Sequence, residues 1–395
     1  MVNTSKKSIK LGLEITLSNA GSLFGDARIG LICNQASVNH EFRHAADLFH
    51  EHPDINLTTL FGPQHGIRGD VQDNMIETGH STDSITGLRI YSLYSETRIP
   101  TGEMLTDVDA MVFDLQDIGC RIYTFVYTMA NCMIACAKSG KKMFVCDRPN
   151  PITGKYVEGN ILEPGHESFV GQYAIAARHG MTAGELALMF NEDFGIGCDL
   201  TVVKMENWAR EDWYDDTDAP WVLPSPNIPV VDTTVVFPAT VVFEGTQVSE
   251  GRGTTKPFEL VGAPFINSKE YADAMNALDL PGIRFRAAEF LPTFQKHAGA
   301  GCRGVQLHVT DRESFAPVKT GVAMVKVIHD LYGDALKWKE PPYEYVYDRN
   351  PFDVINGTDK IRLAIESGGS FADLDEILNA GVPEFLQMRE KHLLY

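Results

Sequence analysis

The sequence predicts an α/β protein with two domains, the first built on a mostly parallel sheet. Three observations support this prediction. The chain has 395 residues, more than one hydrophobic core usually serves. Short apolar runs alternate with predicted helices through the first half of the chain. A glycine also follows one of these helices directly before the next apolar run, as in βαβ units.

The first domain is predicted to contain parallel strands separated by helices. The strands are expected at residues 29–33, 57–61, 110–113, 143–146 and 199–204. The helices are expected at residues 40–51, 123–139 and 181–194. The second of these helices is apolar almost all round, which indicates burial, and Gly140 ends it. Thr182 and Glu185 have the spacing of a capping box at the start of the third.

A proline-rich stretch at residues 215–238 marks the boundary between the domains. It contains DDTDAP, LPSPNIP and FP, so we expect an extended connection rather than a helix or a central strand. The predicted domains are residues 1–232 and 233–395. The second is also α/β but less regular. Its strands are expected at residues 240–244 and 305–310, and its helices at 268–278, 319–331 and 371–378.

Composition and charge exclude several classes of protein. With 44% hydrophobic and 22% charged residues, the chain is typical of a globular domain. A net charge of −19 argues against a nucleic-acid partner, and an anionic substrate would need a local cluster of arginines. No apolar run is long enough to span a bilayer. The basic N-terminal segment lacks the features of a signal peptide. We therefore expect a cytoplasmic protein, or a periplasmic or secreted one whose leader has been removed.

The sequence predicts neither a metal nor a nucleotide cofactor. The seven cysteines form no CxxC pair, and most lie in apolar segments, so buried reduced thiols are expected. No GxGxxG follows the first strand and no GxxxxGK[ST] occurs. A Rossmann-like sheet can exist without a nucleotide, and we expect that arrangement here. The oligomeric state stays open.

Polar side chains follow several predicted strands at the point where each ends. The stretch FGPQHGIRGD, at residues 61–70, brings Gln64, His65, Arg68 and Asp70 together after a buried strand. In open α/β sheets, ligands bind beyond the carboxyl ends of the strands. The sequence therefore predicts one polar site for a small polar molecule.

The stretch DLQDIGCRIYTF, at residues 114–125, supplies a second group of polar residues. Its candidates for the site are Asp114, Gln116, Asp117, Arg121 and Tyr123. A structural role is the alternative: one of the two aspartates caps the following helix, and Arg121 pairs with one of them.

DRPNP, at residues 147–151, supplies a third group. Asp147, Arg148 and Asn150 could bind sugar hydroxyls or an anion, or they could form a network that stabilises the turn.

FEGTQVSEGRGTTKPFE, at residues 243–259, opens the second domain. Glu244, Glu250, Arg252 and Thr254 lie there among glycines that allow close approach of a ligand. A solvated glycine-rich loop is the alternative.

Carboxylates, arginines, amides and tyrosine without a metal or nucleophile motif are typical of a site that processes sugars. Glycoside cleavage needs a proton donor and a base or nucleophile, and several Asp and Glu residues could supply both. A nucleotide-dependent enzyme is supported only by analogy of fold, and the missing phosphate loops oppose it.

Seven motifs in this order resemble the NamZ-type exo-β-N-acetylmuramidases, a bacterial family. They are FGPQHGIRGD, TGLRIYSLYSETRIPT, DLQDIGCRIYTF, DRPNP with the EG that follows, RHGMTAGELA, FEGTQVSEGRGTTKPFE and GCRGVQLHVTD. The resemblance implies a Rossmann-like N-terminal domain, a smaller C-terminal domain and an active site in the cleft between them. It also implies release of N-acetylmuramic acid from the non-reducing end of peptidoglycan fragments in cell-wall recycling. The lactyl carboxylate of that sugar needs a cation, which Arg68, Arg121, Arg148 or Arg252 could provide.

One position departs from the family pattern. Many members carry glutamate where this chain has Gln64, and that glutamate resembles a general acid, whereas an amide cannot deliver a proton. A nearby carboxylate (Asp70, Glu77 or Glu96) could take the role, which is the explanation we favour. Alternatively, the acetamido group of the substrate assists while Gln64 positions it, or the protein binds an amino sugar or muropeptide without cleaving it. The predicted catalytic residues are Gln64, Glu77, Asp114 and Glu250.

Overall fold

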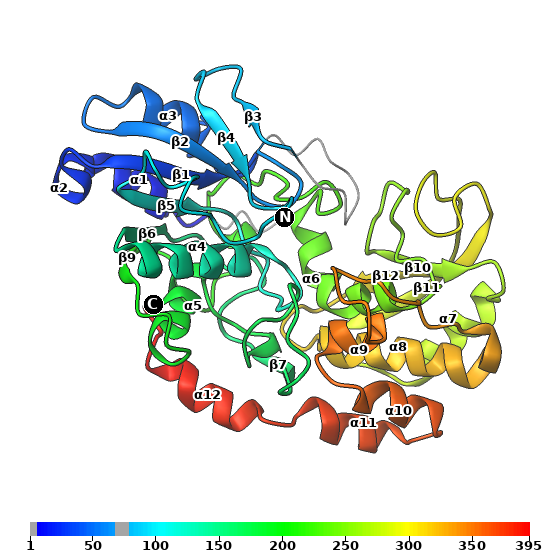
Figure 1. The fold of residues 1–395 in the computed structure, drawn as a ribbon. Coiled ribbons are helices and arrows are strands. Elements are labelled where there is room, and N and C mark those ends of the chain that lie inside the picture. The colour runs from blue at the N-terminus through cyan, green and yellow to red at the C-terminus, as the bar shows by residue number, and fades with distance from the viewer. Residues whose placement is uncertain (1–5, 68–78) are drawn as a thin grey trace.

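The computed structural model describes residues 6–67 and 79–395, and a seven-stranded sheet organises its first half (Figure 1). Neighbouring strands pair in parallel except for β3 and β4, which pair antiparallel. In spatial order the strands are β3 (Ser81–Thr82), β4 (Arg89–Ser92), β2 (Asn56–Gly62), β1 (Arg28–Cys33), β5 (Ala110–Asp114), β6 (Lys142–Cys146) and β9 (Asp199–Val203). The five strands predicted in this half are confirmed to within one residue at each end.

Helices cover both faces of the large sheet. Strand residues alternate between the two faces, so neighbouring apolar residues of one strand pack against different helices. Leu31 and Val112 belong to the core that includes α1–α3, whereas Ile32 and Phe113 belong to the core that includes α4 and α5. The helices are α1 (Gly12–Ser18), α2 (Ala20–Phe24), α3 (Ala45–Glu51), α4 (Phe125–Ser139) and α5 (Ala183–Glu192). The predicted left-handed Gly140 and the capping box of α5 are confirmed, whereas α3 begins five residues later than predicted, at Ala45.

The second half is built around a three-stranded antiparallel sheet with order β10-β12-β11. A two-stranded sheet of β7 and β8 lies between β6 and β9 in sequence. The remaining strands are β7 (Glu158–Ile161), β8 (Ala176–Arg178), β10 (Leu260–Ala263), β11 (Ile283–Phe290) and β12 (Cys302–Val309). The remaining helices are η1 (Tyr214–Asp216), α6 (Val231–Thr240), η2 (Val241–Gly245), α7 (Ser268–Ala277), α8 (Pro317–Tyr332), η3 (Gly333–Ala335), α9 (Pro351–Asn356), α10 (Lys360–Glu366), α11 (Phe371–Leu378) and α12 (Val382–Glu390).

Two predictions near the domain boundary are wrong. Residues 231–240 form the helix α6, with Pro238 inside it, although the prolines predict an extended connection. Residues 240–244, predicted as a strand, form the end of α6 and most of η2. Tertiary packing overrides local preference here, since residues 233–245 are buried throughout. The approach of α6 to α8 requires Gly321, where a Cβ atom would lie 2.1 Å from the carbonyl oxygen of Ala239.

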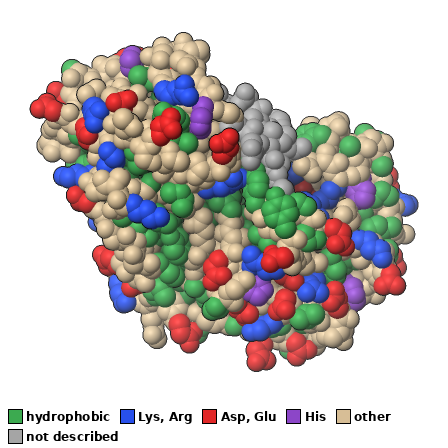
Figure 2. All heavy atoms as spheres, viewed as in Figure 1, with side chains coloured by type: hydrophobic (Ala, Val, Ile, Leu, Met, Phe, Trp, Pro, Cys, Tyr) green, Lys and Arg blue, Asp and Glu red, His purple; other side chains and the backbone are tan. Residues whose placement is uncertain are grey.

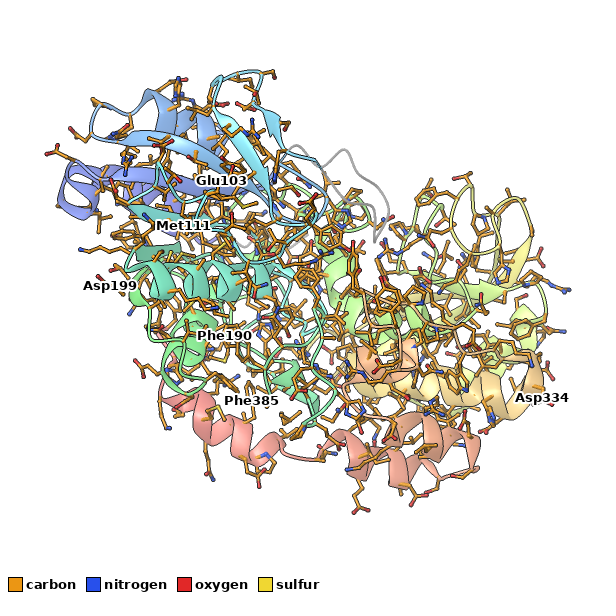
Figure 3. The ribbon with its side chains drawn as sticks, in the orientation of Figure 1. Glu103, Met111, Phe190, Asp199, Asp334 and Phe385 are labelled. Carbon is orange, nitrogen blue, oxygen red and sulfur yellow. The ribbon has the colours of Figure 1, made fainter. Side chains whose placement is uncertain are left out.

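One hydrophobic core extends through both halves of the chain. Figure 3 labels Met111 on β5, Phe190 on α5 and Phe385 on α12, which all belong to the core that also contains the inner face of the small sheet. α12 packs against β7, so the end of the chain returns to the first lobe (Figure 1). All seven cysteines are buried free thiols, as predicted. Within residues 6–67 and 79–395, no helix is long and apolar enough to cross a membrane, and no cluster of metal-binding side chains occurs.

Candidate active site

A cavity lies between elements of both halves of the chain. Figure 2 shows hydrophobic side chains gathered between the two lobes on one face, with charged side chains of both signs around them. The cavity wall combines these two kinds of side chain. It is lined by Gln64, His65, Ile122, Tyr123, Thr124, Phe125, Val170, Ser225, Ile228, Phe237, Val241, Glu244, Arg252, Phe258, Tyr343 and Glu344.

Gln64 enters this cavity from the loop that follows β2. The loop turns sharply, with positive φ angles at His65 and Gly66, and the Gln64 side chain is buried. Its amide is held from two sides. The Thr124 hydroxyl donates to Gln64 Oε1 over 2.8 Å, and Gln64 Nε2 faces Glu344 Oε1 at 3.4 Å. The first contact fixes the orientation of the amide, so that its N–H groups point toward the glutamate.

Glu344 is a buried carboxyl group on the opposite wall. Its Oε2 accepts a 2.8 Å hydrogen bond from the Tyr94 hydroxyl. Burial raises the pKa of Glu344, and the nearby charge of Glu244 adds to the rise, whereas the contacts with Tyr94, Gln64 and Arg98 oppose it. The protonated form of this carboxyl is therefore favoured relative to an exposed glutamate.

Glu244, on η2, has the opposite electrostatic setting in the same cavity. Burial alone would raise its pKa, but the adjacent Arg252 guanidinium and a hydrogen bond from Tyr343 hold the pKa of Glu244 below its usual range. Arg252 Nη2 lies 2.6 Å from Glu244 Oε1, and the Tyr343 hydroxyl donates to Oε2 over 2.6 Å. Within one cavity, the surroundings thus lower the pKa of Glu244 and raise the pKa of Glu344.

A second cavity shares Glu244, Arg252 and Tyr343 with the first, and Glu250 lines it. Both oxygens of Glu250 are paired with cations. Arg252 Nε lies 3.2 Å from Oε1, and Lys296 Nζ lies 2.7 Å from Oε2. Burial lowers the pKa of Lys296, and the ion pair with Glu250 opposes that shift. This buried charge network holds the Arg252 side chain in place next to Glu244.

Asp114 ends β5 and Arg148 lies just after β6, but neither lines either of the two cavities. They form a buried ion pair with two contacts, Nε to Oδ1 at 2.6 Å and Nη2 to Oδ2 at 2.8 Å. Arg148 also donates to the Val38 carbonyl, and the Ser37 hydroxyl donates to the Asp114 carbonyl. The pair thereby connects the ends of three neighbouring strands.

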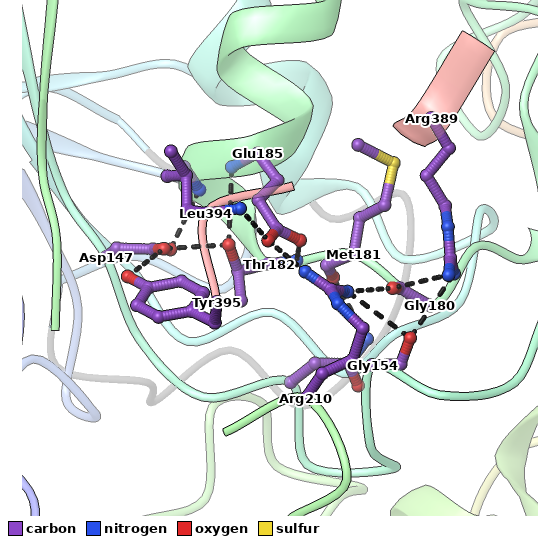
Figure 4. Close-up of polar contacts among 12 residues, drawn as sticks. Asp147, Gly154, Gly180, Met181, Thr182, Glu185, Arg210, Arg389, Leu394 and Tyr395 are labelled. Carbon is purple, nitrogen blue, oxygen red and sulfur yellow. Dashed lines mark hydrogen bonds and ion pairs between the residues drawn. The ribbon is translucent and has the colours of Figure 1, made fainter. Parts of the chain in front are cut away.

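Asp147 and Asn150, in the same DRPNP motif, make local contacts. Asp147 accepts from the Gly184 N–H over 2.8 Å and from the Thr182 hydroxyl over 2.7 Å, which anchors the start of α5 (Figure 4). Asn150 donates to the Met181 carbonyl and accepts from the Ile152 N–H. These contacts correspond to the turn network considered as the alternative for this motif.

Gln116, Asp117 and Arg121 are also engaged with backbone groups. Gln116 Nε2 donates to the carbonyls of Asp117 and Pro149, and Asp117 Oδ2 accepts from the Gly119 N–H. The fully buried guanidinium of Arg121 donates to three carbonyls, those of Asn160, Ile175 and Asn356. Arg121 pairs with neither aspartate, so the alternative that we considered for it is not what the structure shows.

The structure therefore brings together some of the predicted site residues and separates others. Five line the main cavity: Gln64, His65, Tyr123, Glu244 and Arg252. Glu250 lines the adjoining cavity, and the Thr254 hydroxyl donates to the Gly251 carbonyl within its own turn. Arg68, Asp70 and Glu77 lie outside the described residues, and Glu96 is exposed. The catalytic and binding roles of all these residues stay predictions.

Sequence reasoning missed the residues that complete the cavity. Glu344 and Tyr343 lie in PPYEYVYD, where one carboxylate stands among three tyrosines after two prolines. That aromatic-rich loop is the signal that could have drawn attention to them. Thr124 and Tyr94, which hold Gln64 and Glu344, lie in the motifs DLQDIGCRIYTF and TGLRIYSLYSETRIPT, but neither is among the predicted site residues.

Comparison with known proteins matches both halves of the chain to the same family. The N-terminal family model of exo-β-N-acetylmuramidase NamZ matches residues 29–232, and the C-terminal model matches residues 235–395. The chain is 49% identical to the peptidoglycan β-N-acetylmuramidase NamZ of Bacillus subtilis, over 99% of this chain and 93% of that protein. Two DUF1343 family proteins from Bacteroides fragilis have similar crystal structures. One has a TM-score of 0.89 at 36% identity and covers 99% of this chain and 100% of its own. The other has a TM-score of 0.78 at 29% identity and covers 98% and 99%.

Proposed function

The chain belongs to the NamZ family of exo-β-N-acetylmuramidases, and from that premise we propose that it releases N-acetylmuramic acid from the non-reducing end of peptidoglycan fragments. It is a glycoside hydrolase that breaks the bond between the anomeric carbon of the muramic acid residue and the next sugar. Neither the family descriptions nor the name of the Bacillus relative supports the alternative of a sugar-binding protein without activity.

The observation that carries this proposal is the pair of carboxyl groups in one cavity. Burial raises the pKa of Glu344, whereas Arg252 and Tyr343 hold the pKa of Glu244 below its usual range. Hydrolysis of a glycosidic bond needs one protonated and one ionised carboxyl group near the same sugar ring. Two titratable groups whose surroundings move their pKa values in opposite directions meet that need.

The lining of the cavity also suits an amino-sugar residue. Tyr123, Phe237 and Phe258 provide apolar surface for a sugar ring, and Gln64 and Ser225 provide polar groups for its hydroxyl or acetamido substituents. An exo-acting enzyme needs room for one terminal sugar in such a cavity, with the rest of the substrate outside.

Turnover of two glycosides tests the function. The purified protein is incubated with 4-nitrophenyl β-N-acetylmuramide and with the disaccharide of N-acetylmuramic acid linked to N-acetylglucosamine. We expect release of nitrophenol from the first and of free N-acetylmuramic acid from the second. Absence of turnover across about pH 5 to 8, with related amino-sugar glycosides also unreactive, would contradict the proposal.

A further inference from the structure

The loop that carries Glu344 adopts a backbone conformation that few side chains tolerate. Tyr343 and Val346 exchange two backbone hydrogen bonds of 3.0 and 2.9 Å, so Glu344 and Tyr345 are the two central residues of a tight turn. Their φ angles are +43° and +66°. Turns with positive φ at both central positions strongly favour asparagine and glycine. A glutamate held in this conformation indicates that the position of its side chain matters more than the cost in backbone energy.

The turn places the carboxyl group of Glu344 in the cavity wall, directly opposite Gln64. The two residues are 280 positions apart in the chain, yet Gln64 Nε2 lies 3.4 Å from Glu344 Oε1. A carboxyl group from the other half of the chain therefore faces the Gln64 amide at this point of the cavity.

The two oxygens of Glu344 have unequal partners. Oε2 accepts from the Tyr94 hydroxyl at 2.8 Å, whereas the contact of Oε1 with Gln64 is at the long end for a hydrogen bond. Oε1 is therefore the oxygen that can carry a transferable proton. When that proton leaves, the Tyr94 hydroxyl and the Gln64 amide both donate to the resulting carboxylate.

We propose that Glu344 is the catalytic acid of this chain and that it protonates the glycosidic oxygen from its place opposite Gln64. The inference rests on the proposed glycosidase function. The proton of Glu344 passes to the glycosidic oxygen as the bond from that oxygen to the anomeric carbon breaks. The oxygen keeps the electron pair and leaves as an alcohol. The oxygen of a water molecule bonds to the anomeric carbon and keeps one of its protons. The other proton of that water returns to Glu344.

The charged and titratable groups around Glu344 come from several parts of the fold. Tyr94 and Arg98 face it from the segment after β4, Glu244 faces it from η2, and Tyr343 precedes it in the loop. Burial and Glu244 favour the protonated form, whereas Tyr94 and Arg98 favour the carboxylate. Because a general acid must carry its proton, the rate should fall as pH rises through the pKa of Glu344.

The decisive experiment compares Glu344→Gln with wild type on two substrates that differ in their need for a proton. We expect the variant to lose about 10²–10⁴-fold in kcat on the disaccharide, whose leaving sugar must be protonated. It should lose much less on 4-nitrophenyl β-N-acetylmuramide, because nitrophenolate leaves without a proton. The basic limb of its pH–rate profile on the disaccharide should also disappear. Glu340→Gln, an exposed position in the same loop, is the matched control and should behave as wild type.

Two further measurements separate a catalytic role from a structural one. Thermal stabilisation of Glu344→Gln by N-acetylmuramic acid shows that its cavity is intact. Tyr94→Phe removes the donor to Oε2, so it should shift the basic limb to higher pH while the enzyme stays folded and active.

Two results would overturn the inference alone: disaccharide turnover by Glu344→Gln at the wild-type rate, or a basic limb that Tyr94→Phe leaves unmoved. A wild-type protein that cleaves neither substrate would instead overturn the proposed function, and the inference with it.

Discussion

The hydroxyl of Tyr395 donates a 2.8 Å hydrogen bond to Oδ2 of Asp147, a residue 248 positions earlier in the chain. Two neighbouring contacts reinforce this connection (Figure 4). The Leu394 N–H donates to Glu185 Oε1 over 2.8 Å, and Arg389 donates to the carbonyls of Gly154 and Gly180. Residues 389–395 therefore hold α5 and the end of β6 in place from outside the large sheet.

The first prediction concerns the pH dependence that Asp147 gives to stability. Burial raises the pKa of Asp147 from the ordinary 3.8 to about 6, although hydrogen bonds from Gly184, Thr182 and Tyr395 oppose the shift. A raised carboxyl pKa means that folding favours the protonated form. Its stabilising contribution is therefore complete below about pH 4 and is lost as pH rises through about 6.

We expect the free energy of unfolding of wild type relative to Asp147→Asn to fall by about 2 kcal/mol between about pH 4 and 7. The asparagine does not titrate, and the hydroxyls of its partners can reverse to accept from its amide. Urea unfolding at both pH values measures the difference. Asp334→Asn, an exposed position labelled in Figure 3, is the control and should show no such change. A pH-independent difference would contradict the assigned direction.

The second prediction concerns Arg121. Its buried guanidinium satisfies carbonyls from three separate segments, at Asn160, Ile175 and Asn356. Arg121→Met keeps much of the volume but leaves these acceptors without their donor, at a cost of about 1–3 kcal/mol for each group left unsatisfied. We expect a loss of about 3 kcal/mol or more in urea unfolding. Arg43→Met, which removes an exposed ion pair with Glu51, should change stability by about 1 kcal/mol or less.

The third prediction concerns Gln64→Glu, which replaces the amide by a carboxyl group. Two carboxyl groups would then face each other where the amide now lies 3.4 Å from Glu344. Two carboxyl groups this close do not readily ionise together. The pair should therefore release the second of its two protons only at a higher pH. We expect the basic limb of the pH profile of kcat/KM to move upward. Gln247→Glu, at an exposed position, is the control, and a profile identical to that of wild type would argue against close contact.

The fourth prediction concerns recognition of the lactyl carboxylate. Arg68, Arg121, Arg148 and Arg252 are the cations predicted for it. Arg68 lies outside the described residues, and carbonyls or carboxylates of the protein occupy the guanidinium groups of the other three. Arg98 stacks 4.7 Å from the Tyr94 ring and 3.9 Å from the Tyr345 ring. In the part of the chain that the structure describes, its Nε and Nη2 atoms have no hydrogen-bond partner.

We therefore expect Arg98→Gln to raise KM for N-acetylmuramides about tenfold or more, which corresponds to the loss of one hydrogen bond between charged groups. KM for the matching N-acetylglucosaminide, which has no lactyl group, should stay as in wild type. Steady-state kinetics on the two 4-nitrophenyl glycosides gives both values. An equal change in KM for both sugars would exclude a role in recognising the carboxylate.

The strands of the large sheet were predictable because each is an apolar run between polar or glycine-rich segments. α6 was not predictable, since its proline and β-branched residues favour extended backbone, and burial against α8 decides the outcome. Tertiary contacts of this kind are absent from a local pattern.

The candidate site was predictable only in part, for a related reason. Asp114, Arg148 and Asp147 have the residue types of a sugar site, but the same types also satisfy buried backbone groups and one another. Their pattern alone does not separate the two uses. Glu344 was missed because its relation to Gln64 depends on a contact across most of the chain.

Selection for heat tolerance alone should act against the loop at residues 343–346. The substitution Tyr345→Gly would remove the strain at one of the two residues with positive φ and would fit the turn better. A library screened only for survival after heating would therefore tend to enrich that replacement. The enriched enzymes would hold their proton donor less firmly and would exchange turnover for robustness.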